Sequence, residues 1–176
     1  MYIEKLLAEI TQMFESLKIP YLLTGSLAYN IYAVPRATRE IDLIVEIKPT
    51  DIKAFLQAIE GRYYYSEETI NEEVKRKGMF NIIHLESSYK IDLIVRPDDA
   101  FEMTKFNRRR SIEFQDFSIY VITPEDLVIS KLRWIQQLES ELHKRDIETL
   151  LLNPDIDKKY IRNWSETLNL KTYNLI

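Results

Sequence analysis

The chain has 176 residues, 45% of them hydrophobic, which suits one domain with an ample core. Its 24 basic and 28 acidic residues give a net charge of -4, which argues against a protein that coats DNA or RNA through bulk charge. With no cysteine and no apolar run near the roughly 20 residues of a membrane span, we expect no disulfide, thiolate zinc site or membrane segment, and a cytoplasmic location.

Apolar periodicity and turn residues predict mixed secondary structure in the first part of the chain. Apolar side chains recur at helical spacing from Ile3 to Leu17, and Pro20 ends this helix. The expected elements that follow are a strand over 21–23, a turn over 24–26, a short helix over 27–32, a strand over 40–47, helices over 50–60 and 66–77, and a hairpin of strands 79–85 and 89–95.

The second part of the chain is predicted to be mainly helical. We expect a helix over 101–107, a short strand pair over 112–114 and 117–122, and helices from there on. Thr123-Pro124-Glu125-Asp126 has the form of a helix start, with an N-cap, a proline at the first helical position and an acid at the third. We therefore predict an α+β core over 1–122 and a C-terminal helical region over 123–176 packed on it.

Lys131 is the odd member of an otherwise apolar helical stripe. The other members of the stripe are Leu127, Val128, Leu132, Ile135 and Leu138. A lysine there either extends its ammonium group to the rim of the core or has a function, and the sequence alone leaves both open.

The pentapeptide Ile-Asp-Leu-Ile-Val occurs at 41–45 and again at 91–95, and each copy carries one carboxylate. In a strand, residues i and i+2 share a face, so Glu40 points with Asp42, and a neighbouring strand could bring Asp92 beside them. The alternative is that each acid lies at an exposed strand end. Converging carboxylates raise one another's pKa unless a hard cation neutralises them, so the cluster predicts a Mg²⁺ site for phosphoryl or nucleotidyl transfer.

Gly25-Ser26 offers a place for a phosphate. The dipeptide lies between a predicted strand and a predicted helix, so its backbone N–H groups could face an anion. An ordinary strand-to-helix turn is the alternative interpretation.

Two basic runs could contact nucleic acid locally. They are Lys105 with Arg108, Arg109 and Arg110, and Lys75 with Arg76 and Lys77. Such runs are more often solvated surface charge, which is the interpretation we favour.

The order of these motifs resembles the nucleotidyltransferase superfamily that includes DNA polymerase beta and the minimal nucleotidyltransferases. Residues 36–42, Arg-Ala-Thr-Arg-Glu-Ile-Asp, are similar to the Arg-x-Thr-x-Asp-x-Asp form of small bacterial members. Residues 123–127, Lys131-Leu132 and residues 145–150 resemble the AbiEii-type toxin nucleotidyltransferases of abortive-infection and toxin-antitoxin systems. The matches run from about residue 21 to 152.

The resemblance implies a mixed sheet flanked by helices, a two-metal Mg²⁺ site and an NTP substrate. Glu40, Asp42 and Asp92 would be catalytic metal ligands, with Asp92 positioning or deprotonating the attacking hydroxyl. The nucleotide would be bound by Gly25, Ser26 and Lys131. Further substrate contacts would come from Arg36, Thr38, Arg145 and Asp146, although Arg36 and Thr38 could instead fix the loop, and Arg145 and Asp146 could form a surface ion pair.

The implied partners are a nucleotide, an RNA acceptor such as a tRNA end or a protein hydroxyl, and a cognate antitoxin. Glu40 departs from the family pattern, which has Asp at this position. Its extra methylene moves the carboxylate, and a displacement of ~1 Å can cost on the order of a hundredfold in rate. Two functions follow: an Mg²⁺-dependent nucleotidyltransferase, or a catalytically weakened member that binds a nucleotide, RNA or a partner.

Overall fold

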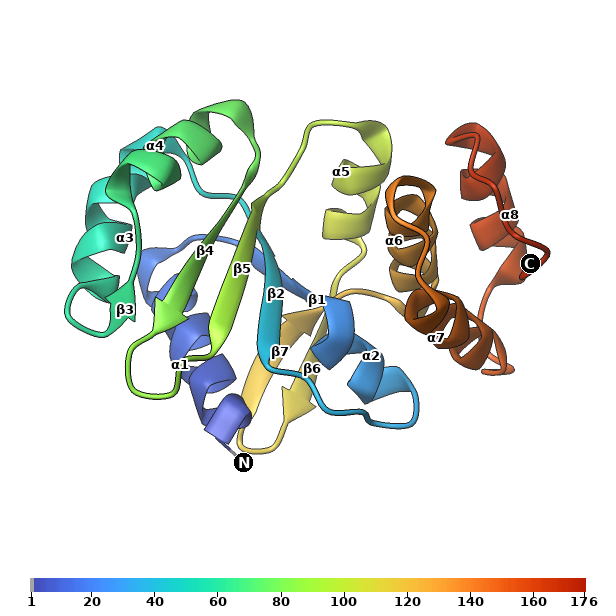
Figure 1. Ribbon diagram of the computed structural model, residues 1–176, viewed down its shortest axis with the longest axis horizontal. Helices are drawn as coiled ribbons and strands as arrows, with labels where there is room; N and C mark the ends of the chain where they lie inside the picture. The colour runs from blue at the N-terminus through green and yellow to red at the C-terminus, as the bar shows by residue number, and fades with distance from the viewer. Residues whose placement is uncertain (1) are drawn as a thin grey trace.

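The computed structural model describes residues 2–176, and a seven-stranded mixed sheet forms its centre (Figure 1). The strands are β1 Tyr21–Thr24, β2 Glu40–Val45, β3 Tyr63–Tyr64, β4 Met79–His84, β5 Lys90–Val95, β6 Arg110–Phe114 and β7 Phe117–Val121. Their spatial order is β3-β4-β5-β2-β1-β7-β6, with β2–β5 and β1–β7 parallel and the other neighbours antiparallel. The predicted mixed α and β fold is therefore confirmed.

The two Ile-Asp-Leu-Ile-Val segments are adjacent strands in the middle of this sheet. β2 and β5 pair in parallel without a shift, from Glu40 opposite Lys90 to Val45 opposite Val95. A strand that is covered on both faces has a nearly continuous apolar sequence. The repeated pentapeptide is therefore the sequence of a central strand, used twice side by side.

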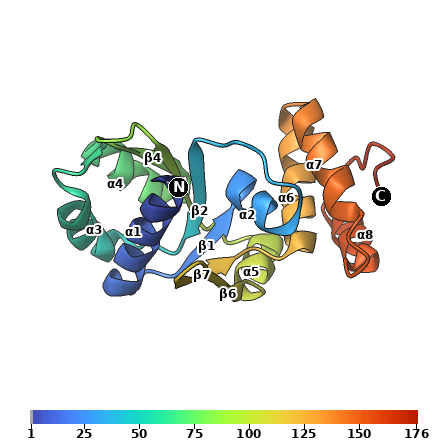
Figure 2. The same cartoon turned by 90° about the horizontal axis from the view of Figure 1, so that it is seen from below.

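Helices cover the sheet and extend beyond one end of it. They are α1 Tyr2–Leu17, α2 Gly25–Tyr32, α3 Ile52–Ile59, α4 Glu67–Arg76, α5 Ala100–Asn107, α6 Pro124–Gln137, α7 Glu141–Leu151 and α8 Lys158–Thr167, with a 3₁₀ turn at Pro49–Asp51. Figures 1 and 2 show α3 and α4 at one end of the molecule and α6, α7 and α8 together at the other. Among residues 2–176, no helix has both the length and the apolar character needed to cross a membrane.

Most predicted elements are confirmed, and the differences have local causes. Strand β3 was not predicted, because two residues are too few to show an alternating pattern. The C-terminal part is helical only in α6, α7 and α8, so the prediction was wrong for residues 138–140, 152–157 and 168–176. Leu138 is 67% exposed and lies outside the buried stripe, because α6 ends one residue earlier.

Asp126 joins two helices of the C-terminal region to α5 of the core. Its carboxylate, 0% exposed, accepts hydrogen bonds from the Thr123 hydroxyl at 2.7 Å, the Tyr160 hydroxyl at 2.7 Å and Arg108 Nε at 3.0 Å. These partners come from the start of α6, from α8 and from the end of α5. The acid at the third helical position, which the sequence marks as part of a helix start, thus also stabilises the packing of the helices.

The first basic run is used mostly inside the protein. Lys105 is buried and pairs with Glu102 at 2.6 Å, Arg108 pairs with Asp126, and Arg109 stacks on Phe106 at 4.4 Å. Arg110 is exposed on β6.

The second basic run is also partly paired, since Arg76 bonds to Glu73 and Lys77 to Asp98. Most of these charges are therefore already neutralised by the protein itself, which does not favour a broad nucleic-acid surface.

Replacing Asp126 with alanine should destabilise the protein by about 3 kcal/mol, because the substitution leaves buried donors without their acceptor. Urea unfolding followed by circular dichroism would measure this loss. Asp155→Ala is the matched control, since Asp155 is exposed and its removal should change stability by less than about 0.5 kcal/mol. Equal losses for the two variants would contradict the structural role of Asp126.

Candidate functional site

Glu40, Asp42 and Asp92 converge at one end of the central strands. One carboxylate oxygen from each lies within 4.8 Å of the others. The parallel register produces this convergence, because Asp42 is directly opposite Asp92 and Glu40 lies two residues before Asp42 on the same face. The sequence prediction that the three acids meet is confirmed. Carboxylate oxygens at this spacing are the hard donors that Mg²⁺ prefers, so the residues fit a divalent metal.

Asp42 also contacts the turn that follows β1. Thr24, the last residue of β1, is the register partner of Asp42, and α2 begins at Gly25. Gly25 has φ +67°, and a Cβ atom added to it would lie 2.0 Å from Asp42 Oδ2. Glycine is thus needed here both for its backbone conformation and for space. The close approach places the carboxylate against the N-terminus of α2, at the turn that the sequence marks as a candidate phosphate site.

The pKa of Asp42 is raised to about 6, mainly by burial and then by the neighbouring charges of Asp92 and Glu40. A hydrogen bond from the Ser26 backbone amide and the charge of Lys90 act against this shift. An acid that resists ionisation near neutral pH gains from a bound cation. The electrostatics of Asp42 therefore favour a metal ligand over a simple exposed strand end.

Lys90 is a member of the site that the sequence prediction did not include. Its Nζ lies 2.8 Å from Glu40 Oε1 and 2.9 Å from Asp92 Oδ2. Hydrogen bonds to Glu40 and then to Asp92 raise the pKa of Lys90, so it stays charged. A signal was present in the sequence: the residue before each copy of the pentapeptide is Glu40 in one and Lys90 in the other, an oppositely charged pair.

A second group of charges lies beside the Gly25-Ser26 turn. Arg36 donates to Ser26 Oγ at 2.9 Å and to both Asp146 oxygens, at 2.9 and 3.2 Å. Lys131 Nζ donates to the same carboxylate at 2.8 Å, and the Asp146 residue is 2% exposed. Asp146 thus holds two cations, one of them in direct contact with the turn.

The pKa values in this group follow from burial and pairing. Burial lowers the pKa of Lys131, although Asp146 opposes the shift. Burial acts to raise the pKa of Asp146, but hydrogen bonds from Arg36 and Lys131 outweigh it and hold the pKa below its usual value. Lys131 therefore does not simply extend to solvent: it is 4% exposed and pairs with a buried acid.

The loop between α2 and β2 is fixed by side-chain hydrogen bonds. Asn30 donates to the Arg36 carbonyl at 2.8 Å and accepts from the Arg36 amide at 3.0 Å. Thr38 Oγ1 accepts from the Glu40 amide at 3.3 Å. Thr38 thus supports the loop, while Arg36 does so through its backbone and also sends its guanidinium group into the site.

Arg145 precedes Asp146 on α7 but does not take part in the hydrogen bonds that join Asp146 to Arg36 and Lys131. It is exposed, and its carbonyl accepts a hydrogen bond from Thr149 within the helix. Asp146 pairs with Arg36 and Lys131, so the structure contradicts the alternative that Arg145 and Asp146 form a surface ion pair. Asp146 faces inward because it lies on the buried side of α7 with Ile147 and Leu150.

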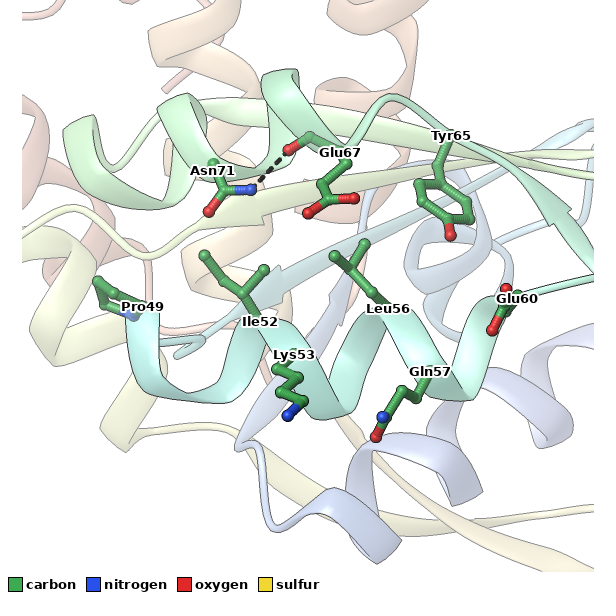
Figure 3. A pocket seen from close by; sticks show the side chains of 9 residues that line it. All are labelled: Pro49, Ile52, Lys53, Leu56, Gln57, Glu60, Tyr65, Glu67 and Asn71. Atoms are coloured by element: carbon green, nitrogen blue, oxygen red, sulfur yellow. Dashed lines mark hydrogen bonds between the residues drawn. The ribbon is translucent and has the colours of Figure 1, made fainter.

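A groove of about 410 Å³ lies elsewhere, between α3 and α4 (Figure 3). Its lining includes Ile52, Leu56 and Tyr65, together with Glu60 and Glu67. None of the candidate site residues lines it, and Lys53 is the one basic residue in the lining. The groove therefore does not have the charge expected of a triphosphate site.

Comparison with known proteins places the chain among nucleotidyltransferases. Residues 2–172 match the family described as "Nucleotidyltransferase of unknown function (DUF6036)". No curated protein matches the chain significantly.

Solved structures share the fold at low sequence identity. The lincosamide antibiotic adenylyltransferase LnuA with lincomycin bound is 17% identical, with a TM-score of 0.52 over 84% of this chain and 95% of that one. ANT(2'')-Ia in complex with adenylyl-2''-tobramycin is 11% identical, with a TM-score of 0.62 over 96% and 98%. An antigenic nucleotidyltransferase-like protein from Paracoccidioides brasiliensis is 14% identical, with a TM-score of 0.57 over 90% and 83%.

Gly25→Ala should lower the free energy of unfolding by about 2 kcal/mol or more, because the substitution adds backbone strain at positive φ and a clash with Asp42. Gly61→Ala is the matched control: Gly61 has φ +73°, but an added Cβ has no atom within 4 Å. Urea unfolding of both variants measures the difference that is due to Asp42. In an Asp42→Ala background the cost at Gly25 should fall but stay above that at Gly61, because the contact with the Cβ atom of residue 42 at 2.8 Å remains. An unchanged cost would contradict the contact with the carboxylate.

Metal-free protein should lose stability as pH rises from about 4 to above 6. The pKa of Asp42 is about 6 in the folded protein against an ordinary value of 3.8, so the folded state binds the proton more tightly. Below pH 4 the carboxyl is protonated in both states. Above pH 6 its ionisation costs about 3 kcal/mol.

Asp42→Asn removes this penalty, so in EDTA its stability relative to wild type should increase from pH 4 to pH 7. Thermal unfolding across this pH range would measure the difference. A stability gap between the two proteins that is independent of pH would contradict the raised pKa.

Proposed function

The chain belongs to the nucleotidyltransferase family that it matches over residues 2–172, and from this we propose that it is a Mg²⁺-dependent enzyme that moves a nucleotide from an NTP to a hydroxyl group. The observation that carries the proposal is the close approach of the Asp42 carboxylate to Gly25. It joins the candidate metal ligands to the candidate phosphate-binding turn at one point.

The three carboxylates would hold the metal at the ends of β2 and β5. When bound, the metal would supply Lewis-acid activation of the phosphates and of the attacking oxygen. Asp42, which contacts both the cluster and the turn, would hold the metal on the side of the α-phosphate. Asp92 would orient the acceptor hydroxyl and accept its proton while the acceptor oxygen bonds to the α-phosphorus and pyrophosphate leaves.

The turn and the Asp146 network would bind the remaining phosphates. The N-terminus of α2 directs the positive end of its dipole at the Gly25-Ser26 turn, where the Ser26 amide already bonds to Asp42. Arg36 already contacts Ser26, and Lys131 is held on the same Asp146 carboxylate. A triphosphate at the turn would gain two cations whose positions are fixed in advance, which reduces the ordering cost of binding.

The acceptor follows from the chemistry only as a hydroxyl group. The resemblance to AbiEii-type proteins suggests RNA, such as a tRNA end, or a protein, and with it a toxin role and an antitoxin partner. The titles of two neighbours name antibiotics instead, lincomycin bound to LnuA and tobramycin adenylylated at its 2'' position. We propose testing all three acceptor classes.

A second candidate function is a catalytically weakened member that binds a nucleotide or partner. The exposure and pairing of the Glu40 side chain favour this candidate. This side chain is 52% exposed and is paired with Lys90, so it is the least enclosed of the three acids. Glu40 is still an oxygen donor within the cluster.

Wild-type protein should transfer label from at least one α-labelled NTP in Mg²⁺ to total RNA, cell extract or a panel of aminoglycosides and lincosamides. Asp42→Asn should reduce transfer by at least about a hundredfold, because it removes the ligand that joins metal and turn. Asp155→Asn, at an exposed position, is the control and should retain wild-type transfer. Label incorporation on gels and by mass spectrometry gives the measurement.

Glu40→Asp separates the two functions. If wild type transfers nucleotide weakly and Glu40→Asp transfers much more, the protein is a catalytically weakened member. If wild type is active and Glu40→Asp brings no gain, the proposed enzymatic function is supported. Wild-type labelling no greater than that of Asp42→Asn with every acceptor would refute the enzyme.

A further inference from the structure

Lys90 places an ammonium group between two of the candidate metal ligands. Nζ lies 2.8 Å from Glu40 Oε1 and 2.9 Å from Asp92 Oδ2, which are lengths of charge-assisted hydrogen bonds. The sheet fixes this position, because Lys90 is the register partner of Glu40 and lies two residues before Asp92 on the same face. Lys90 therefore reaches the cluster from the backbone of a central strand.

Lys90 contacts two of the three carboxylates that a metal would use. Mg²⁺ binds oxygen at about 2.0–2.1 Å, so an ion held by Glu40 and Asp92 together would lie within a few ångströms of the ammonium group. At such distances two positive charges repel each other strongly when they are partly shielded from water. Asp92 is the enclosed partner, with its side chain 11% exposed, while that of Lys90 is 38% exposed and has room to move outward.

The charge of the cluster supports the same conclusion. Three ionised carboxylates carry -3, and in the metal-free protein Lys90 reduces this to -2. Asp42 has its carboxylate against Gly25. Lys90 pairs with Glu40 and Asp92, so a divalent ion that takes these two carboxylates would have to displace it.

We propose that Lys90 is a built-in competitor of the metal. It pairs with Glu40 and Asp92 in the metal-free protein, and a divalent ion that takes both carboxylates displaces it. Lys90 therefore sets the metal affinity of the cluster and neutralises the acids between binding events. This rests on the proposed function only in that the cluster binds a divalent ion, and nucleotide transfer is not required.

The first test is titration of the full chain with Mn²⁺ alone, by calorimetry. Lys90→Met keeps the apolar stem but removes the charge, and it should bind Mn²⁺ about tenfold more tightly than wild type because a nearby positive charge is gone. Lys75→Met is the control, at an exposed lysine on α4, and should leave the affinity unchanged. The proposal is overturned if Lys90→Met binds Mn²⁺ no more tightly than wild type does. It is also overturned if neither protein binds Mn²⁺.

A second measurement uses only wild-type protein, so it stands if Lys90→Met does not fold. Amine-reactive labelling followed by peptide mass spectrometry compares Lys90 in EDTA and in saturating Mg²⁺, with Lys75 as the internal reference. Displacement should make Lys90 react several-fold faster in Mg²⁺, while Lys75 is unchanged. A rate at Lys90 that stays the same or falls overturns the proposal.

These outcomes are distinguishable from those of the transfer assay. If wild type binds Mn²⁺ but transfers no nucleotide, and Lys90→Met binds Mn²⁺ more tightly, the proposed role of Lys90 is supported and the proposed enzymatic activity is refuted. Active transfer with unchanged Mn²⁺ affinity in Lys90→Met supports the enzyme and overturns the role of Lys90.

Discussion

The parallel pairing of β2 with β5, without a shift, is the constraint on which the site depends. Ile41, Leu43, Ile91 and Leu93 are fully buried, so the two strands must lie side by side in the core. A shift of one residue would turn every side chain of a strand to the other face. Burial of apolar side chains therefore also determines that Asp42 lies opposite Asp92 and Glu40 opposite Lys90. The cost of this arrangement is that three carboxylates of like charge lie close together.

Two groups of the protein partly offset the repulsion among these carboxylates. Lys90 supplies a positive charge on one side of the cluster, and the Ser26 amide supplies a hydrogen bond on the other. Neither fully offsets the burial of Asp42, whose pKa remains raised. A site that is still short of positive charge after its own residues have contributed is suited to bind a cation.

The Asp146 network connects the C-terminal helices to this site. Lys131 from α6 and Arg36 from the loop before β2 share one buried carboxylate on α7, and Arg36 continues to Ser26. Buried ion pairs add little net stability because desolvation offsets their attraction. Their value lies in fixing the positions of charged groups, which here are Lys131 and Arg36, the latter in contact with Ser26.

Much of the fold could be predicted from local patterns. The helical stripe from Ile3 to Leu17, the start of α6 at Pro124 and the strands β4 and β5 agree with the structure because their signals lie within one element. Strand β3 has two residues and carries no such signal. The convergence of the three acids was predictable because two identical segments suggested equivalent central strands.

What the sequence determined by itself is a set of candidate site residues: the carboxylates at 40, 42 and 92, the glycine at 25 and the lysine at 131 each break a local pattern. Only the tertiary structure decided their partners. It placed Lys90 between Glu40 and Asp92, and it turned Asp146 toward Arg36 and Lys131 and away from Arg145. The physical reason is that strand register and helix packing bring together charges from separate elements, such as Glu40 with Lys90, and Arg36 with Asp146 at a separation of 110 residues. No local pattern encodes such pairings.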